Sequence, residues 1–307
     1  MFSRKSIGVS FSLTSVAFAQ LSGPASAPRL ERVSQRSFPT DVLRFSLREK
    51  NILDTALFSE TVREAHNSLL SRSGRVFLTL PDTVGRVMLL DVEERFKSRS
   101  EALDILRWKL KKKVPFDISE AHLDYQQLAT SDNGGTVVLV VMVARAVIEQ
   151  YEEALNSAGI VPVGIDLDCF NLYRVFENRL VAFDDFALVS RFASSLGIMF
   201  FSGGRPEFIR IRDFLGMHAL DATVHNEIKC SMLAYRDRFK EREVRNVFYI
   251  APPQGAKVFR EIVRDAMGCE PVLLETRSTI SAEENIPSDQ ESLYPFSTAI
   301  GAALRDL

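Results

Sequence analysis

The chain has 307 residues, a net charge of −2 at pH 7, 46% hydrophobic residues and 25% charged residues. This composition is typical of a soluble protein with a sizeable core, and the near-neutral charge gives no general attraction to nucleic acid. No stretch approaches the roughly 18 consecutive apolar residues of a membrane-spanning helix. The length favours two lobes. The three cysteines and four histidines are widely spaced, so we expect neither a disulfide framework nor a metal site.

The first twenty residues allow two interpretations. A basic start, an apolar stretch and an Ala-x-Ala triplet at 17–19 form the outline of a secretory signal peptide. However, serines and threonines interrupt the apolar stretch, and from Ile7 to Leu13 apolar residues alternate with small polar ones. Alternation with a period of two indicates a half-buried strand, and the apolar phase shifts after residues 14–15. We therefore favour a β-hairpin.

Strands and helices are then mixed along the first half of the chain. Periodicity and turn residues predict strands over residues 29–40, 75–80, 85–92, 121–129, 136–144 and 161–167. Helices are expected from a cap at Ser59 to Gly74, over 101–113 after a cap at Ser98 or Ser100, and over 146–159.

The second half begins in the manner of the first. Three strands are expected within residues 186–212, and these elements follow: a helix at 218–239, a strand at 246–251, a helix at 254–267 stopped by Gly268, a strand at 271–275, a polar loop at 276–293 and a helix at 296–305. Strands that lead into helices and further strands thus occur twice. This duplication of topology predicts an α/β protein with two similar lobes.

Two lobes that each begin with a β-hairpin resemble the actin-like, or ribonuclease H-like, architecture of actin, Hsp70 and the sugar kinases. The segment 108–128 more specifically resembles the signature of the PilM family of type IV pilus assembly proteins, in which a helix runs into Pro-Phe-Asp and then Asp-Tyr-Gln. Segments 141–177 and 299–305 resemble further parts of that family.

The resemblance implies a duplicated two-lobe fold with an inserted subdomain in the first lobe. Placed on this chain, the first lobe takes residues 1–77 and 163–184, and the inserted subdomain takes 78–162. The second lobe then takes residues 185–307.

In the nucleotide-binding members of this architecture, each hairpin turn carries an Asp-x-Gly phosphate loop. The glycine lets backbone amides approach phosphate oxygens, and the aspartate holds Mg²⁺ through water. Here Ser10 and Ser12 stand at these positions in the first turn, and Ser190 and Phe192 stand there in the second. The Gly-Gly pair that packs against adenosine falls on prolines within residues 251–253, which lack an N–H.

Two residues of the nucleotide site remain, Asp166 and Gly301. In active relatives an acidic residue in the segment of Asp166 orients water, but Asp166 is also compatible with a strand-end residue that caps the next helix. The resemblance therefore implies a pseudo-ATPase with no bound cofactor, in place of the ATP and Mg²⁺ of other members. An active ATPase with unusual phosphate loops is the alternative, because serine hydroxyls can donate to phosphate.

The resemblance also implies a partner. PilM proteins are cytoplasmic adaptors that bind the N-terminal tail of the inner-membrane protein PilN and link the alignment complex to the motor ATPases. The tail lies in a groove between the first lobe and the inserted subdomain. On this chain the signature residues Pro115, Phe116, Asp124 and Tyr125 are the candidates for that groove. A GspL-like component of type II secretion and an FtsA-like polymer-forming scaffold are the alternatives.

A basic cluster lies at the start of the signature segment and just before it. Arg107, Lys109 and residues 111–113 surround Trp108, the only tryptophan of the chain. The cations are compatible with a surface for acidic lipid or an acidic partner, but we favour a solvated helix terminus whose positive charges favour the helix dipole. Trp108 fits a partner groove or the core.

Overall fold

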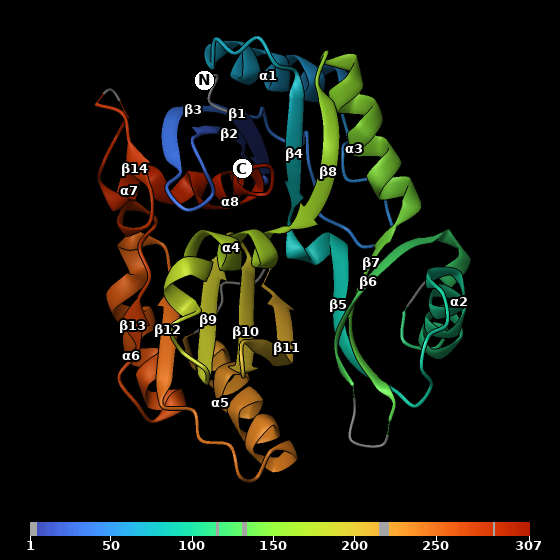
Figure 1. Ribbon diagram of the computed structural model, residues 1–307. Coiled ribbons are helices and arrows are strands. Elements are labelled where there is room, and N and C mark those ends of the chain that lie inside the picture. The colour runs from blue at the N-terminus through green and yellow to red at the C-terminus, as the bar shows by residue number, and fades with distance from the viewer. Residues whose placement is uncertain (1–4, 115–116, 131–133, 215–220, 285) are drawn as a thin grey trace.

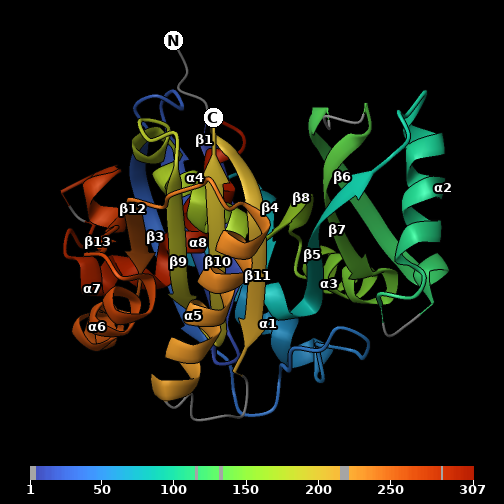
Figure 2. The same ribbon diagram turned by 90° about the horizontal axis from the view of Figure 1, so that it is seen from below.

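The computed structural model describes residues 5–114, 117–130, 134–214, 221–284 and 286–307. Three β-sheets with helices packed on them make up the molecule, as Figure 1 shows. A six-stranded sheet forms the first lobe and a five-stranded sheet forms the second. A three-stranded sheet forms a unit at the side of the first lobe (Figure 2). The predicted α/β class with two lobes and an inserted subdomain is confirmed.

The first sheet has the strand order β14-β3-β2-β1-β4-β8. Its strands are β1 (Lys5–Phe11), β2 (Ser15–Ser22), β3 (Arg29–Ser37), β4 (Arg75–Leu80), β8 (Val161–Leu167) and β14 (Ser281–Ala282). β1 and β2 pair antiparallel from Lys5 opposite Ser22 to Phe11 opposite Val16, which confirms the hairpin. β8 is the outer strand at one edge, and among the described strands only β4 pairs with it.

Helix α1 (Thr55–Ser68) begins earlier than the sequence predicts. Its N-cap is Asp54, whose side chain accepts a hydrogen bond from the Leu57 amide at 3.0 Å, and not Ser59. Ser59 is buried within the helix and its hydroxyl donates to the Ala154 carbonyl at 3.0 Å. The predicted cap was wrong because a serine that bonds a neighbouring helix resembles a capping serine in sequence.

The inserted subdomain leaves the first sheet after β4 and returns to it at β8. It contains β5 (Gly85–Val92), α2 (Arg99–Leu110), β6 (Ala121–Thr130) and β7 (Thr136–Ala144), with β7 between β5 and β6. Ser98 caps α2 by accepting from the Glu101 amide at 3.2 Å, as one of the two predicted caps. Alternate residues of β7 (Val138, Val140 and Met142) form a core with Leu106 and Leu110 of α2.

Two helices connect the inserted subdomain to the rest of the molecule. Helix α3 (Arg145–Ser157) runs from β7 to β8 and packs against α1, and α4 (Asp168–Leu180) follows β8 directly. None of the helices in the described ranges is long and apolar enough to span a bilayer.

The second sheet has the strand order β11-β10-β9-β12-β13. Its strands are β9 (Phe186–Phe192), β10 (Ser195–Ser202), β11 (Arg205–Asp213), β12 (Asn246–Ile250) and β13 (Val272–Leu273). Helices α5 (Asp221–Arg238) and α6 (Ala256–Met267) pack with this sheet in a second core. Gly268 ends α6 in the left-handed region with φ of 76°, as predicted.

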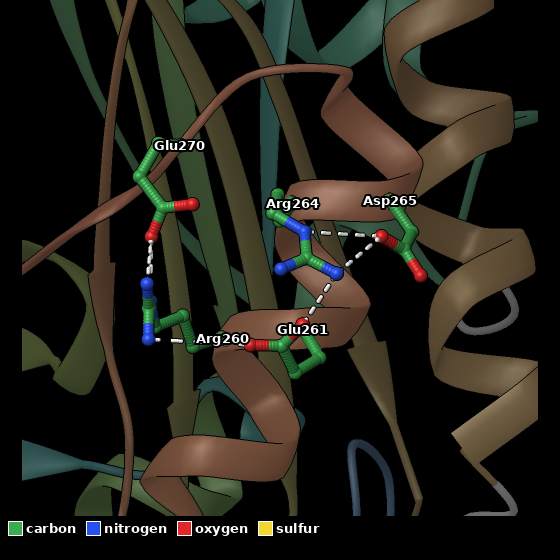
Figure 3. Close-up of polar contacts among 5 residues, drawn as sticks. All are labelled: Arg260, Glu261, Arg264, Asp265 and Glu270. Atoms are coloured by element: carbon green, nitrogen blue, oxygen red, sulfur yellow. Dashed lines mark hydrogen bonds and ion pairs between the residues drawn. The ribbon is translucent and has the colours of Figure 1, made fainter.

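The outer face of α6 carries charges of both signs that pair with each other (Figure 3). Arg260 contacts Glu270 and Glu261, and Arg264 contacts Glu261 and Asp265. Exposed pairs of this kind contribute little to stability, so their main effect is to leave this surface locally neutral.

The end of the chain returns to the first lobe. The predicted loop over 276–293 contains β14, which pairs with β3, and α7 (Gln290–Leu293). Helix α8 (Ser297–Leu304) then packs against β1, β2, β4 and α4. The lobe boundaries proposed from sequence stay a prediction, although β14 and α8 lie on the first sheet. Helix α8 packs on the first sheet because it is apolar and buried on nearly all sides.

Two glycines allow α8 to pack closely against β1 and α4. A Cβ on Gly301 would lie 2.1 Å from the Asn171 carbonyl oxygen of α4, and one on Gly8 would lie 1.9 Å from the Ala299 carbonyl oxygen. Single turns of 3₁₀ helix complete the description: Asp82–Val84, Ile118–Glu120, Pro253–Gly255, Thr276–Ser278 and Tyr294–Phe296.

Candidate functional site

A cavity of about 930 Å³ lies where the inserted subdomain, β8, α4 and the second lobe meet. We call it the β8 cavity. Its apolar lining comes from helices α3 and α4 and from strands of all three sheets, and it includes Val141, Ile148, Ile165, Phe170, Tyr173, Phe201 and Ile209. The rings of Tyr173 on α4 and Phe201 on β10 stack at 5.1 Å, which joins the first lobe to the second at the wall of the cavity.

Three outer strands border this cavity, and one of them is β11 of the second sheet. Residues 162–167 of β8 line one side, and residues 124–128 of β6 line another. Each is the last strand of its sheet at that edge. The outward backbone N–H and C=O groups of an outer strand can pair with an added extended segment. The β8 cavity therefore combines apolar surface with strand edges, which suits an extended peptide.

Asp166 lies on the wall of this cavity between two arginines. Its Oδ2 is 3.2 Å from Nη2 of Arg174 and 3.0 Å from Nη1 of Arg305. Nη1 of Arg174 also donates to the Gly301 carbonyl at 3.3 Å. Arg174 thus brings together the two residues of the nucleotide motifs that remained in the sequence. Asp166 does not cap α4, because the residue before that helix is Leu167 and the first-turn amide of Cys169 donates to Asp82 instead.

The first hairpin turn satisfies its own polar groups. The Ser12 hydroxyl oxygen accepts from the Thr14 amide at 3.3 Å and from the Ser15 amide at 3.0 Å. Ser10 is buried in β1, opposite Ala17 of β2. The amides that a phosphate loop presents to its ligand are therefore bonded to a serine of the same turn.

Aromatic packing occupies the second turn. The Phe192 ring, at the position of the family glycine, lies 5.3 Å from the Tyr294 ring. The Tyr294 hydroxyl donates to the Arg191 carbonyl at 2.7 Å. Ser190 is buried on β9, and its hydroxyl lies 2.6 Å from where a Cβ on Gly197 would stand. The Ser190 side chain therefore lies close to the backbone of β10.

Two buried carboxyls that the sequence analysis did not single out lie beside these strands. Cys169 donates its amide to Asp82 Oδ1 at 2.9 Å, and the Thr79 hydroxyl donates to Asp168 Oδ1 at 2.8 Å. Burial raises the pKa of Asp82 from 3.8 to about 6. Burial and the neighbouring Asp82 charge raise the pKa of Asp168 well above its usual value. One signal in the sequence could have pointed to Asp168, because this residue directly follows the strand predicted over 161–167.

The signature residues divide into two groups. Asp124 and Tyr125 lie on β6 and line the β8 cavity, while Pro115 and Phe116 fall outside the described residues. Nη2 of Arg99 lies 2.6 Å from Asp124 Oδ1, and the Tyr125 ring packs against Phe96. Within the described ranges, no three His, Cys, Asp or Glu side chains gather in a way that could hold a metal ion.

Solved structures share this fold over nearly the whole chain. A chain of a PilM-PilN type IV pilus biogenesis complex matches with a TM-score of 0.79 and 18% identity, covering 98% of each chain. The cytoplasmic domain of EpsL, an inner membrane component of the type II secretion system of Vibrio cholerae, matches with a TM-score of 0.55 and 11% identity, over 99% of this chain and 96% of that one.

A Bacteroides thetaiotaomicron protein of actin-like ATPase fold gives a TM-score of 0.50 at 10% identity, over 90% of this chain and 92% of that one. A search of curated proteins by sequence gives no match. Two hairpin-led lobes, a third sheet inserted between β4 and β8, and these matches define an actin-like protein.

The family model of the type IV pilus assembly protein PilM matches residues 8–192, more than half of the chain. The chain therefore belongs to the PilM family, as its 108–128 signature predicted.

Proposed function

We propose that this PilM-family chain binds the N-terminal cytoplasmic tail of a PilN protein in the β8 cavity. The observation that carries the proposal is the position of the cavity, between the first lobe and the inserted subdomain and bordered by the outer strands β8 and β6. The matching chain from the PilM-PilN complex has the same fold over 98% of its length.

The lining of the cavity fits an extended segment with apolar side chains. Such a segment can add its backbone to the edge of β8 and place alternate side chains against Ile148, Phe170 and Ile209. The resemblance predicted a groove formed by the first lobe and the inserted subdomain. Ile209 belongs to β11, so on our proposal the second lobe adds a third wall.

We further propose that the chain is a pseudo-ATPase that keeps the actin-like fold for binding. The described residues fit MgATP poorly. The first turn bonds its own amides through Ser12, the second turn holds Phe192 against Tyr294, and Pro252 and Pro253 have no N–H. Asp166 is held by Arg174 and Arg305.

These two proposals together describe an adaptor. Bound to the tail of PilN, the chain would lie on the cytoplasmic side of the inner membrane and link that membrane protein to the pilus motor. A GspL-like role in type II secretion is the second candidate, favoured by the EpsL match over 99% of this chain.

Titration of the purified chain with a peptide of the PilN N-terminal tail tests the proposal directly. Ile148→Asp places a charge on the apolar wall and is expected to weaken binding at least about 30-fold, as loss of a binding hot spot does. Val258→Asp is the matched control, because Val258 is an exposed valine on α6 outside the cavity. Absence of peptide binding at high micromolar concentration, or an equal loss in both variants, contradicts the proposal.

A further inference from the structure

Trp108 is far more exposed than the other aromatic side chains of the described residues. It lies on α2 with 77% of its surface accessible, so it belongs neither to the core nor to the β8 cavity. Lys111 is the C-cap residue of α2, and Lys112 and Lys113 follow it in the turn after the helix. All three lysines are exposed.

Some of the cations at this end of α2 lie near carboxylates, because hydrogen bonds from Ser119 and the charge of Lys111 both lower the pKa of Asp117. Arg107 pairs with Asp104 at 3.3 Å and Lys109 with Glu94 at 3.7 Å, but within the described ranges neither Lys112 nor Lys113 has an ion-pair partner. The outer face of α6 is the opposite case, because both of its central arginines are paired (Figure 3). The end of α2 therefore presents free charge.

This surface faces away from the β8 cavity. Val138, Val140 and Met142 of β7 pack on α2, whereas Leu139, Val141 and Val143 line the cavity on the other face of the same sheet. Figure 2 shows α2 at the outer side of the inserted subdomain. A ligand at the end of α2 and a peptide in the cavity can thus be bound at the same time.

We propose that Trp108 with Lys111, Lys112 and Lys113 binds the anionic surface of a lipid bilayer. Tryptophan side chains favour the headgroup region of a bilayer, where the ring is apolar and the indole N–H remains hydrated. Lysines near an anionic leaflet are attracted to it. The four residues lie at one exposed end of α2, and the pockets of the described residues do not include them, which suits a broad charged surface better than a single small ligand.

The inference rests in part on the proposed function, because a chain that holds the short tail of a membrane protein works close to the bilayer. The two ideas still fail separately. Vesicle binding is measured without any PilN peptide, and peptide binding is measured without vesicles.

Because Trp108 is the only tryptophan, tryptophan emission excited selectively over that of the six tyrosines reports on this surface alone. On titration with vesicles of phosphatidylcholine and phosphatidylglycerol, we expect a blue shift of the emission that is absent with phosphatidylcholine alone. Raising the salt concentration is expected to reverse it, since salt screens exposed charges. Lys111→Ala with Lys112→Ala is expected to weaken partitioning about 25-fold, from roughly fivefold per lysine.

The matched control is Lys229→Ala with Lys257→Ala, two exposed lysines on α5 and α6 that change the net charge equally. This control is expected to bind vesicles as the unchanged chain does. Trp108→Ala, measured by co-sedimentation, is expected to weaken binding as well. No shift with anionic vesicles, equal loss in the two double variants, or binding of polyglutamate in place of vesicles would overturn the proposal.

Discussion

The β8 cavity and the two hairpin turns are both built from strands. They differ in whether their backbone polar groups are available to a partner. Around the cavity, β8 and β6 are outer strands whose outward backbone groups face a lined space. At the first hairpin turn, the Ser12 hydroxyl accepts hydrogen bonds from the amides of its own turn. At the second turn, Phe192 packs against Tyr294. Polar groups that are left available can bind a partner, whereas groups that are satisfied internally stabilise the fold.

Gly301 shows why this difference matters for interpreting a family motif. It matches a position of the nucleotide site in sequence, yet in the structure it lets α8 approach α4, where a Cβ would lie 2.1 Å from the Asn171 carbonyl oxygen. A glycine at such a position is thus required by packing, whatever the site binds.

The largest expected effect is on stability, from Gly301→Ala. The added methyl group overlaps the Asn171 carbonyl of α4, and Arg174 of the same helix bonds the Gly301 carbonyl, so we expect a loss of about 3 kcal/mol in the free energy of unfolding. Urea unfolding measures it. Gly255→Ala is the control, because a Cβ there has no neighbour within 4 Å and the φ of −116° suits any residue. A neutral Gly301→Ala would remove the packing explanation.

A similar effect, of opposite sign, is expected from Asp82→Asn at alkaline pH. The pKa of Asp82 is raised by burial from 3.8 to about 6, which corresponds to about 3 kcal/mol. The raised pKa means that the folded state binds more protons between these values, so stability falls as pH rises from about 4 to about 6 and stays lower above. Asparagine is neutral throughout and keeps an acceptor for the Cys169 amide.

The difference in unfolding free energy between Asp82→Asn and the unchanged chain should therefore be near zero at pH 4 and reach about 3 kcal/mol in favour of the variant at pH 8. Urea unfolding across this range measures it, with the exposed Asp91→Asn as control. A variant that is less stable at pH 8 would mean that the buried carboxylates are needed in their charged form.

A smaller effect, about tenfold or ~1.4 kcal/mol, is expected on affinity for the PilN tail from Ile209→Asp. Ile209 lines the cavity from the second lobe, so the variant asks whether that lobe forms part of the binding surface. Leu233→Asp, at an exposed leucine of α5, is the control in the same titration. Unchanged affinity in Ile209→Asp would restrict the peptide to the first lobe and the inserted subdomain.

The last prediction is that calorimetry detects no sub-millimolar binding of MgATP. We expect affinity weaker than about 1 mM for the unchanged chain, and the same for Ser10→Asp with Ser12→Gly, because Phe192 still packs against Tyr294 at the second turn. Sub-millimolar binding of MgATP that Asp166→Asn abolishes would favour the active-ATPase alternative. The hairpin turns would then bind a ligand, as we propose for the β8 cavity.

Local patterns predicted much of the fold because short-range physics decides them. The alternation from Ile7 to Leu13 predicted β1, and Gly268 predicted the end of α6, since a left-handed residue stops a helix. Ser59 misled the sequence analysis because its partner is the Ala154 carbonyl, distant in the chain.

By itself, the sequence determined the duplicated α/β architecture, the PilM signature and the loss of the Asp-x-Gly residues, because these depend on residue type and order. Only the tertiary structure decided where the residues act. It placed Asp166 between Arg174 and Arg305, and α8 on the first sheet. The lining of the β8 cavity comes from segments far apart in the chain, and contacts of that kind leave no local periodicity in a sequence.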